Sequence, residues 1–163
     1  MSLWFINRKN HRDTENTELA QRNQTEMKTS YLDHVTAAPV EITFVMVLGH
    51  DRADREMEKG SFLTRCVQAG EVHELVAVKA NTLDKGKYHG ASYLGFVTFN
   101  GPAVIYVGES LFIEGKQIGV LGGFDYTHFP NHMNILIETE QPTNGKNLGI
   151  TVGQSGEFSG SEK

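Results

Sequence analysis

The chain lacks several features on which whole classes of protein depend. It has one cysteine, Cys66, which excludes an internal disulfide and a zinc site built from several cysteines. No apolar run comes close to the ~20 residues that a membrane-spanning helix needs. Positive charge is not in excess, because 15 Lys+Arg stand against 20 Asp+Glu for a net charge of -5. We therefore expect neither nucleic acid nor a membrane as a partner, since both recruit clustered cations.

Catalytic and targeting motifs are also missing. The sequence contains no Walker loop, no G-x-S-x-G motif and no dinucleotide-binding fingerprint. The glycine-rich stretch GVLGGF (residues 119–124) does not open a helix, so it offers no helix N-terminus to a phosphate. The only apolar run near the start, residues 3–6, is too short for a secretion signal. We expect a cytoplasmic protein.

The composition divides the chain into three parts. Residues 1–40 are almost wholly polar and show neither a helical nor a strand period, which predicts an irregular N-terminal arm. Residues 41–153 hold most of the apolar side chains and form the predicted β domain. Residues 154–163 are rich in glycine and serine, which predicts a flexible C-terminal tail. Contacts with a neighbouring subunit would order the arm, so we also expect a homo-oligomer.

The β domain is predicted from short runs of β-branched and apolar residues at roughly ten-residue spacing. Turn signals such as Glu114-Gly115 separate the runs. This pattern is typical of a mainly β fold, either an antiparallel β-barrel or a sandwich of about eight or nine short strands with at most one or two short helices. Interior glycines at Gly95 and Gly119 suit the bends of a small barrel, which we favour. The runs cover residues 41–48, 61–69, 72–80, 92–99, 103–108, 110–113, 116–124, 133–140 and 148–153.

Three local features of the β domain lead to more specific predictions. Residues 50–60 (HDRADREMEKG) are either a short helix that ends at Gly60 or a charged, solvated loop. Cys66 lies in an alternating run and is predicted to be a buried thiol. In the run 72–80, Glu74 and Lys79 fall on opposite faces, so one of them is expected to point inward and to need a partner.

The best candidate site is the loop DYTHFPNH (Asp125–His132), which joins two predicted core strands. Pro130 disfavours helix at the preceding residue, so His128 and His132 are not a helical ligand pair. With Asp125 they supply the ligand types of a two-histidine, one-carboxylate site for a divalent metal. Alternatively, Asp125 and Asn131 bind the backbone of the loop itself, and the histidines are partly buried and satisfied.

A second polar stretch runs from Lys79 to Ser92 (KANTLDKGKYHGAS). Lys79 could hold a carboxylate or phosphate as a point charge, and His89 could act as an acid or base near neutral pH. The same composition is also typical of an exposed hairpin without a binding role.

Three functions are compatible with these residues. The leading hypothesis is binding of a small polar or anionic molecule by Asp125, His128, Asn131 and His132, with Lys79 as a further ligand-binding residue. The second is a metal-dependent or acid–base enzyme, with His128, Asp125 and His89 as candidate catalytic residues. The third is a structural protein that assembles into homo-oligomers without a catalytic site.

Overall fold

Ten β-strands make up the regular secondary structure of residues 35–160, which are the residues that the computed structural model describes. This range contains no helix, and so no helix that could cross a membrane. The predicted arm lies almost entirely outside it, as do residues 161–163. The strands are β1 (Val40–Val47), β2 (Asp51–Glu58), β3 (Thr64–Val67), β4 (Val72–Lys79), β5 (Lys87–Phe99), β6 (Ala103–Tyr106), β7 (Ser110–Ile113), β8 (Lys116–Asp125), β9 (Asn134–Thr139) and β10 (Ser155–Ser159).

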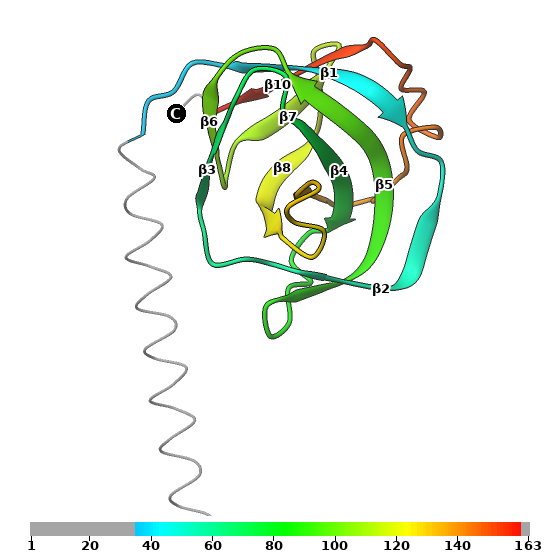
Figure 1. Cartoon of the computed structure of the whole chain (residues 1–163). Helices are drawn as coiled ribbons and strands as arrows, with labels where there is room; N and C mark the ends of the chain where they lie inside the picture. The colour runs from blue at the N-terminus through cyan, green and yellow to red at the C-terminus, as the bar shows by residue number, and fades with distance from the viewer. Residues whose placement is uncertain (1–34, 161–163) are drawn as a thin grey trace, which may run out of the picture. The chain divides into compact units, whose positions relative to one another are not determined.

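Seven strands close into a barrel (Figure 1). Their order is β1-β10-β7-β8-β9-β4-β5, and pairing between β1 and β5 completes the ring. All neighbours run antiparallel except β4 and β9, which run parallel. The predicted mainly β barrel is therefore confirmed, but it is a mixed barrel and not a purely antiparallel one. A closed sheet leaves none of its seven strands with an open edge.

The charged segment after β1 is neither the helix nor the loop that the sequence suggested. It forms β2, which pairs with the first half of β5 from Asp51 opposite Ser92 to Glu58 opposite Lys87. Because β5 supplies the backbone partners, the strand needs little apolar content, and Met57 is its only buried side chain. Exposed charges along an outer strand also discourage unwanted pairing with other chains.

The prediction for Cys66 is also wrong. Cys66 lies on β3, which forms a separate two-stranded sheet with β6, and its side chain is exposed. On β3 the core-facing position belongs to Val67 instead. In a strand of four residues the alternation is too short to reveal which face is buried.

The C-terminal tail was predicted to be flexible from residue 154, but residues 155–159 form a strand of the barrel. β10 pairs with β1 on one side and β7 on the other. Phe158 is fully buried in the core. Gly156 faces Ile42, and a Cβ atom there would lie 3.1 Å from the carbonyl oxygen of Phe112. The glycine that made the segment look flexible thus permits close packing of this strand.

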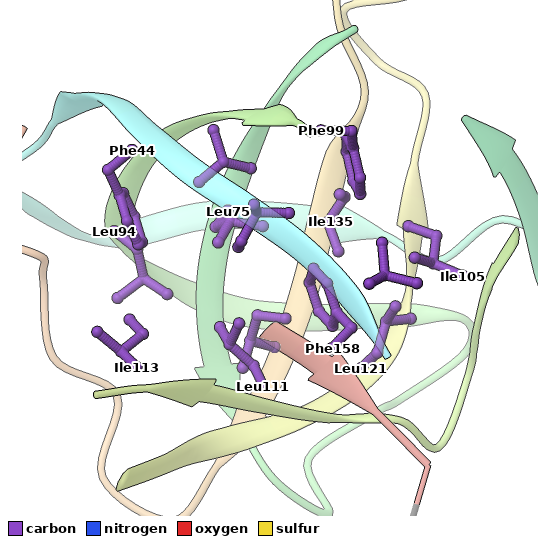
Figure 2. Packing of buried hydrophobic residues seen from close by; sticks show 14 of the residues in the cluster. Phe44, Leu75, Leu94, Phe99, Ile105, Leu111, Ile113, Leu121, Ile135 and Phe158 are labelled. Atoms are coloured by element: carbon purple, nitrogen blue, oxygen red, sulfur yellow. The ribbon is translucent and has the colours of Figure 1, made fainter. Parts of the chain in front are cut away.

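The interior of the barrel is filled with packed apolar side chains (Figure 2). Within β4, Leu75 and Ala77 point into this core. The remaining fully buried residues come from every other strand of the ring, and they include Ile42, Phe44, Leu94, Phe99, Leu111, Leu121, Phe124, Ile135, Ile137 and Phe158. The barrel is therefore a solid core in which the lumen is occupied by the chain itself.

A second apolar layer lies on the outside of the barrel. It contains Met57 of β2 together with outward-facing residues of β4, β5 and β9, namely Val76, Val78, Tyr88, Ala91, Tyr93 and Leu136. Because β2 contributes to this layer, both faces of β4 are buried and its sequence reads as nearly continuous apolar residues. The alternation sends His73 inward with Leu75, and Glu74 outward with Val76.

Candidate functional site

Three buried polar side chains form a row across β8, β9 and β4 on the outer face of the barrel. Asp125 pairs with Asn134, and Asn134 pairs with Glu74, so the three residues are in register. Their exposed fractions are 0%, 1% and 6%. We call Asp125, Asn134 and Glu74 the polar row. Burial of three such groups is costly unless each is hydrogen-bonded or has another role.

Asp125 is fully satisfied by the backbone. Its Oδ2 atom accepts a hydrogen bond from the amide of Glu58 at 3.2 Å, and its Oδ1 atom accepts one from the amide of Thr127 at 2.7 Å. The first bond anchors the end of β2 over the row, and the second shapes the start of the 125–132 loop. For Asp125, the structure thus matches the alternative prediction, in which this aspartate binds the backbone of the loop itself.

The second carboxyl group of the row, that of Glu74, has a perturbed pKa. Burial raises the pKa of its carboxyl group to about 7, and the nearby charge of Asp125 acts in the same direction, while Arg55 opposes the shift. Its Oε2 atom lies 3.6 Å from Nε2 of His132. A carboxyl group in this state exchanges a proton close to neutral pH.

His132 faces Glu74 from the 125–132 loop. Its Nδ1 atom lies 2.9 Å from the side-chain amide nitrogen of Asn131, which donates, so the ring proton resides on Nε2 and points toward Glu74. Burial and the neighbouring His128 lower the pKa of His132 below its usual value. The nearby side chain of Asn134 opposes the shift, although its geometry falls short of a hydrogen bond. The ring stacks on His128 with centroids 5.0 Å apart and meets the edge of Phe96.

Asn134 lies in the middle of the row without a satisfied amide. Neither its Oδ1 nor its Nδ2 atom has a hydrogen-bond partner, although both are buried, and Nε2 of His132 also lacks one that meets hydrogen-bond geometry. Buried polar atoms are nearly always paired, so each exception calls for an explanation. Of the six such side-chain atoms in residues 35–160, three belong to Asn134 and His132, and the others are on Arg65, His73 and Glu109.

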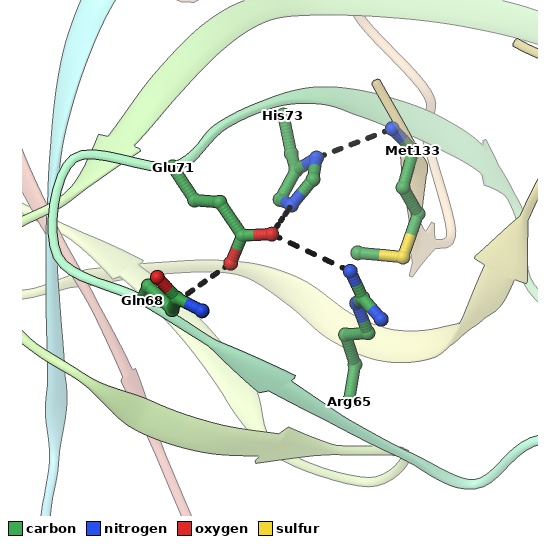
Figure 3. Close-up of polar contacts among 5 residues, drawn as sticks. All are labelled: Arg65, Gln68, Glu71, His73 and Met133. Carbon is green, nitrogen blue, oxygen red and sulfur yellow. Dashed lines mark hydrogen bonds and ion pairs between the residues drawn. The ribbon is translucent and has the colours of Figure 1, made fainter. Parts of the chain in front are cut away.

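A second polar network lies at the inner face of β4 (Figure 3). The Oε1 atom of Glu71 is 3.4 Å from Nη2 of Arg65 and 3.6 Å from Nε2 of His73. The Nδ1 atom of His73 accepts a hydrogen bond from the amide of Met133 at 3.2 Å, and the amide of Gln68 donates to Oε2 of Glu71 at 2.7 Å. Burial lowers the pKa of His73. Nδ1 of His73 is thus committed, whereas its buried Nε2 lies near Glu71 without meeting hydrogen-bond geometry. The network joins β3, β4 and the chain entering β9.

The structure unites some of the residues predicted from sequence and separates others. Asp125, His128, Asn131 and His132 lie in or beside the polar row as described above. Lys79 is exposed at the opposite end of β4 from Glu74 and pairs with Glu140 at 3.3 Å. His89 is exposed on β5 with Glu56 at 3.7 Å. Neither Lys79 nor His89 joins the other candidates.

The geometry offers no support for a divalent metal at this loop. Among residues 35–160, no three histidine, cysteine, aspartate or glutamate side chains are grouped so that they could hold a metal ion. Both oxygens of Asp125 already accept hydrogen bonds from backbone amides. A site formed by Asp125, His128 and His132 therefore stays a prediction from sequence.

Glu74 and Asn134 were not among the predicted site residues, although their positions carried a signal. Each occupies the outward position of an alternating strand whose next outward residue, Val76 or Leu136, is apolar and buried. A polar side chain in such a position has to be buried as well. What the sequence could not supply is the parallel pairing of β4 with β9, which places the two residues side by side.

Comparison with known proteins identifies a family but no activity. The model of the family described as "Family of unknown function (DUF6917)" matches residues 34–159. No curated protein and no solved structure matches the chain.

Proposed function

The chain belongs to this family of unknown function, DUF6917, and we propose that its β-barrel binds a small polar molecule at the polar row. The observation that carries the proposal is the buried amide of Asn134, which lacks a partner for both its donor and its acceptor. A bound molecule with one hydroxyl, amide or amine group would satisfy it.

The charges around the row favour a neutral or cationic ligand. Asp125 and Glu74 both carry carboxyl groups, and the basic side chain that acts on Glu74 is Arg55. The sequence allowed an anionic ligand mainly through Lys79, which lies at the other end of β4. An anion would meet two carboxyl groups at short range, and this repulsion disfavours it.

Access to the row would run past the 125–132 loop. Residues 127–131 are exposed, whereas His132 and the row are largely covered. The imidazole of His132 can donate from Nε2, and Glu74 can donate or accept depending on its protonation. The ligand would thus meet a donor, an acceptor and a switchable group within one small site.

The test is a thermal-shift screen of polyols, amides, amines and carboxylates with wild type and Asn134→Leu. Leucine replaces the unpaired amide with an apolar side chain, so the unliganded variant should be as stable as wild type or more so. We expect neutral or amine compounds to stabilise wild type, by about 2.7 kcal/mol at a concentration of 100 Kd, and to lose this effect in the variant. Asn147→Leu makes the same replacement at an exposed position and should bind normally. Equal stabilisation of Asn134→Leu, or stabilisation by carboxylates alone, would overturn the proposal.

A second candidate function is acid–base catalysis by Glu74 and His132. It is favoured by one observation, the 3.6 Å approach of a carboxyl group with a pKa of about 7 to an imidazole with a lowered pKa. Two such groups can pass one proton between them near neutral pH, which suits general acid–base chemistry. The first test is an NMR titration of the His132 ring, whose midpoint should move in Glu74→Gln. Any activity found should then fall roughly 10²- to 10⁴-fold in that variant.

A further inference from the structure

A pair of glycines on β8 makes room for a cluster of ionisable groups away from the polar row. The register of β8 against β9 shifts between Leu121 and Gly123, which leaves Gly122 as the extra residue of a β-bulge. Bulges of this kind re-aim neighbouring positions and are frequent beside functional sites. The two glycines belong to the GVLGGF stretch, for which the sequence offered no phosphate-binding role.

Each glycine lies under a different charged side chain. A Cβ atom on Gly122 would lie 2.6 Å from Cγ of Glu138 and 3.1 Å from the hydroxyl oxygen of Tyr88. A Cβ atom on Gly123 would lie 2.8 Å from Cγ of Lys59. Consecutive Cα atoms are only about 3.8 Å apart, so Lys59 and Glu138 cross neighbouring points of the same strand. Any larger residue at these positions would push them aside.

The carboxyl group of Glu138 is held in place by Tyr88. The Tyr88 hydroxyl donates a hydrogen bond to Oε1 of Glu138, and the tyrosine is fully buried. Burial and the adjacent carboxylate both raise the pKa of Tyr88, so the phenol stays protonated and remains a donor. Glu138 itself is only partly buried, and within residues 35–160 its other oxygen accepts no hydrogen bond.

Lys59 is positioned by its backbone and is poor in compensating charge. Its amide donates to the carbonyl oxygen of Gly86 at 2.8 Å, and the next amide, of Gly60, donates to Phe124 at 2.7 Å. Within residues 35–160 its amine forms no ion pair. Burial lowers its pKa, and the charge of Glu138 partly opposes this. More of the amine is therefore neutral at a given pH than in an ordinary lysine.

We propose that Lys59 is a nucleophilic amine that forms an imine with a small aldehyde or ketone, and that Glu138 carries the protons of this reaction. Neither role depends on a ligand at the polar row. A desolvated lysine beside a fixed proton carrier is the arrangement that imine chemistry requires. Tyr88 is a positioning residue, because it acts through Glu138.

The reaction balances with the groups present. The neutral Nζ of Lys59 attacks the carbonyl carbon, a C–N bond forms, and the carbonyl electron pair moves to oxygen. Glu138 takes a proton from the nitrogen and delivers it to that oxygen, giving a carbinolamine. Glu138, protonated again from solvent water, then gives a proton to the hydroxyl group, and the nitrogen lone pair expels this group as water. The iminium ion that remains returns its N–H proton to Glu138 and so to solvent, which leaves the imine with no net proton consumed. Amine and carbonyl compound thus become imine and water, with no oxidant or reductant consumed.

The test traps the imine by reduction. The full chain is treated with acetaldehyde and sodium cyanoborohydride near pH 7, about three units below the ordinary lysine pKa, and labelling is measured for each lysine by peptide mass spectrometry. We expect Lys59 to be labelled several-fold faster than Lys116, which is exposed in the same molecule and serves as the internal reference. Labelling of Lys59 at the rate of Lys116, or more slowly, would overturn the proposal.

A Glu138→Gln variant separates a proton carrier from a mere neighbour. Removing the carboxylate frees more of the Lys59 amine, so acetylation by acetic anhydride, which needs only the free amine, should keep its rate or rise. Imine trapping should instead fall several-fold, because the proton carrier is gone. If trapping rises in parallel with acetylation, Glu138 has no role in proton transfer and that assignment is wrong. Lys59→Arg keeps the charge over Gly123 and should abolish the label at this position alone.

Discussion

The buried carboxyl group of Glu74 should make stability depend on pH in a way that one substitution isolates. Its pKa is about 7 in the folded protein against 4.5 for an ordinary glutamate. Between pH 4.5 and about 7, the folded state therefore keeps a proton on Glu74 that the unfolded chain has already released. Stability contributed by the protonated form is present below pH 4.5 and is lost as the pH rises toward 7.

The size of the effect follows from the two pKa values. At about 1.4 kcal/mol for each pH unit, the window from 4.5 to about 7 corresponds to roughly 3 kcal/mol. Glu74→Gln keeps the shape of the side chain but cannot ionise. Relative to wild type, the variant should therefore gain about 3 kcal/mol as the pH rises across the window. Glu109 is fully buried and also has a pKa raised to about 7 by burial, but it is present in both proteins and cancels in the difference.

The assay is urea unfolding of both proteins at a series of pH values between about 5 and 8, with the slope m checked for equality. Glu41→Gln, which changes an exposed carboxyl group on β1, is the matched control and should leave the pH dependence unchanged. A stability difference between wild type and Glu74→Gln that stays constant over this range would refute the reasoning. It would mean that Glu74 ionises as readily in the fold as in the unfolded chain.

Two further substitutions and one deletion test the architecture. Gly95→Ala should lower the free energy of unfolding in urea by roughly 2–4 kcal/mol, because its Cβ would lie 2.1 Å from the carbonyl oxygen of Met46 at a φ of +149°. The control Gly86→Ala has open space around it and should cost about 1 kcal/mol. Equal costs would contradict the close approach of β1 and β5. Deleting residues 155–163 should abolish the cooperative thermal unfolding transition, as measured by circular dichroism. A chain that ends at residue 160 keeps β10 and should unfold cooperatively. A cooperative transition in the shorter chain would disprove the role of β10. Tyr88→Phe should lower the free energy of unfolding by about 1–3 kcal/mol, since the partly buried carboxylate of Glu138 loses its donor; an unchanged value would show that water replaces the phenol at no cost.

The barrel was predictable from local signals, whereas its strand order was not. β-branched runs and turns such as Glu114-Gly115 identify β4, β7 and β8 directly, because these strands are bounded by turn residues and bury one or both faces. β2 was not predicted, because hydrogen bonds to its partner strand β5, and not a pattern in its own side chains, hold it in an extended conformation. β10 was not predicted, because glycine and serine are compatible both with a mobile tail and with a tightly packed strand. Neither distinction can be made without knowing the neighbour.

The candidate site was predictable only in its loop. His128, Asn131 and His132 stand out by composition, and the structure groups them. Glu74 lies more than fifty residues earlier in the chain, and it meets His132 because β4 and β9 run side by side. Lys79 was also predicted as a site residue, but it lies at the other end of β4 from Glu74. Long-range pairing, which no local pattern encodes, decided both outcomes.

The ring closure has a consequence for the order in which the molecule can be made. β1 is held between β5 and β10, and of the strands in residues 35–160 β10 is the last to leave the ribosome. A nascent chain that stops short of residue 155 exposes the pairing edges of β1 and β7. Cooperative folding of the barrel must therefore wait until β10 has been synthesised, and contacts between such distant segments form slowly, over roughly milliseconds to seconds. We expect the unfinished polypeptide to depend on chaperones that shield these edges until release.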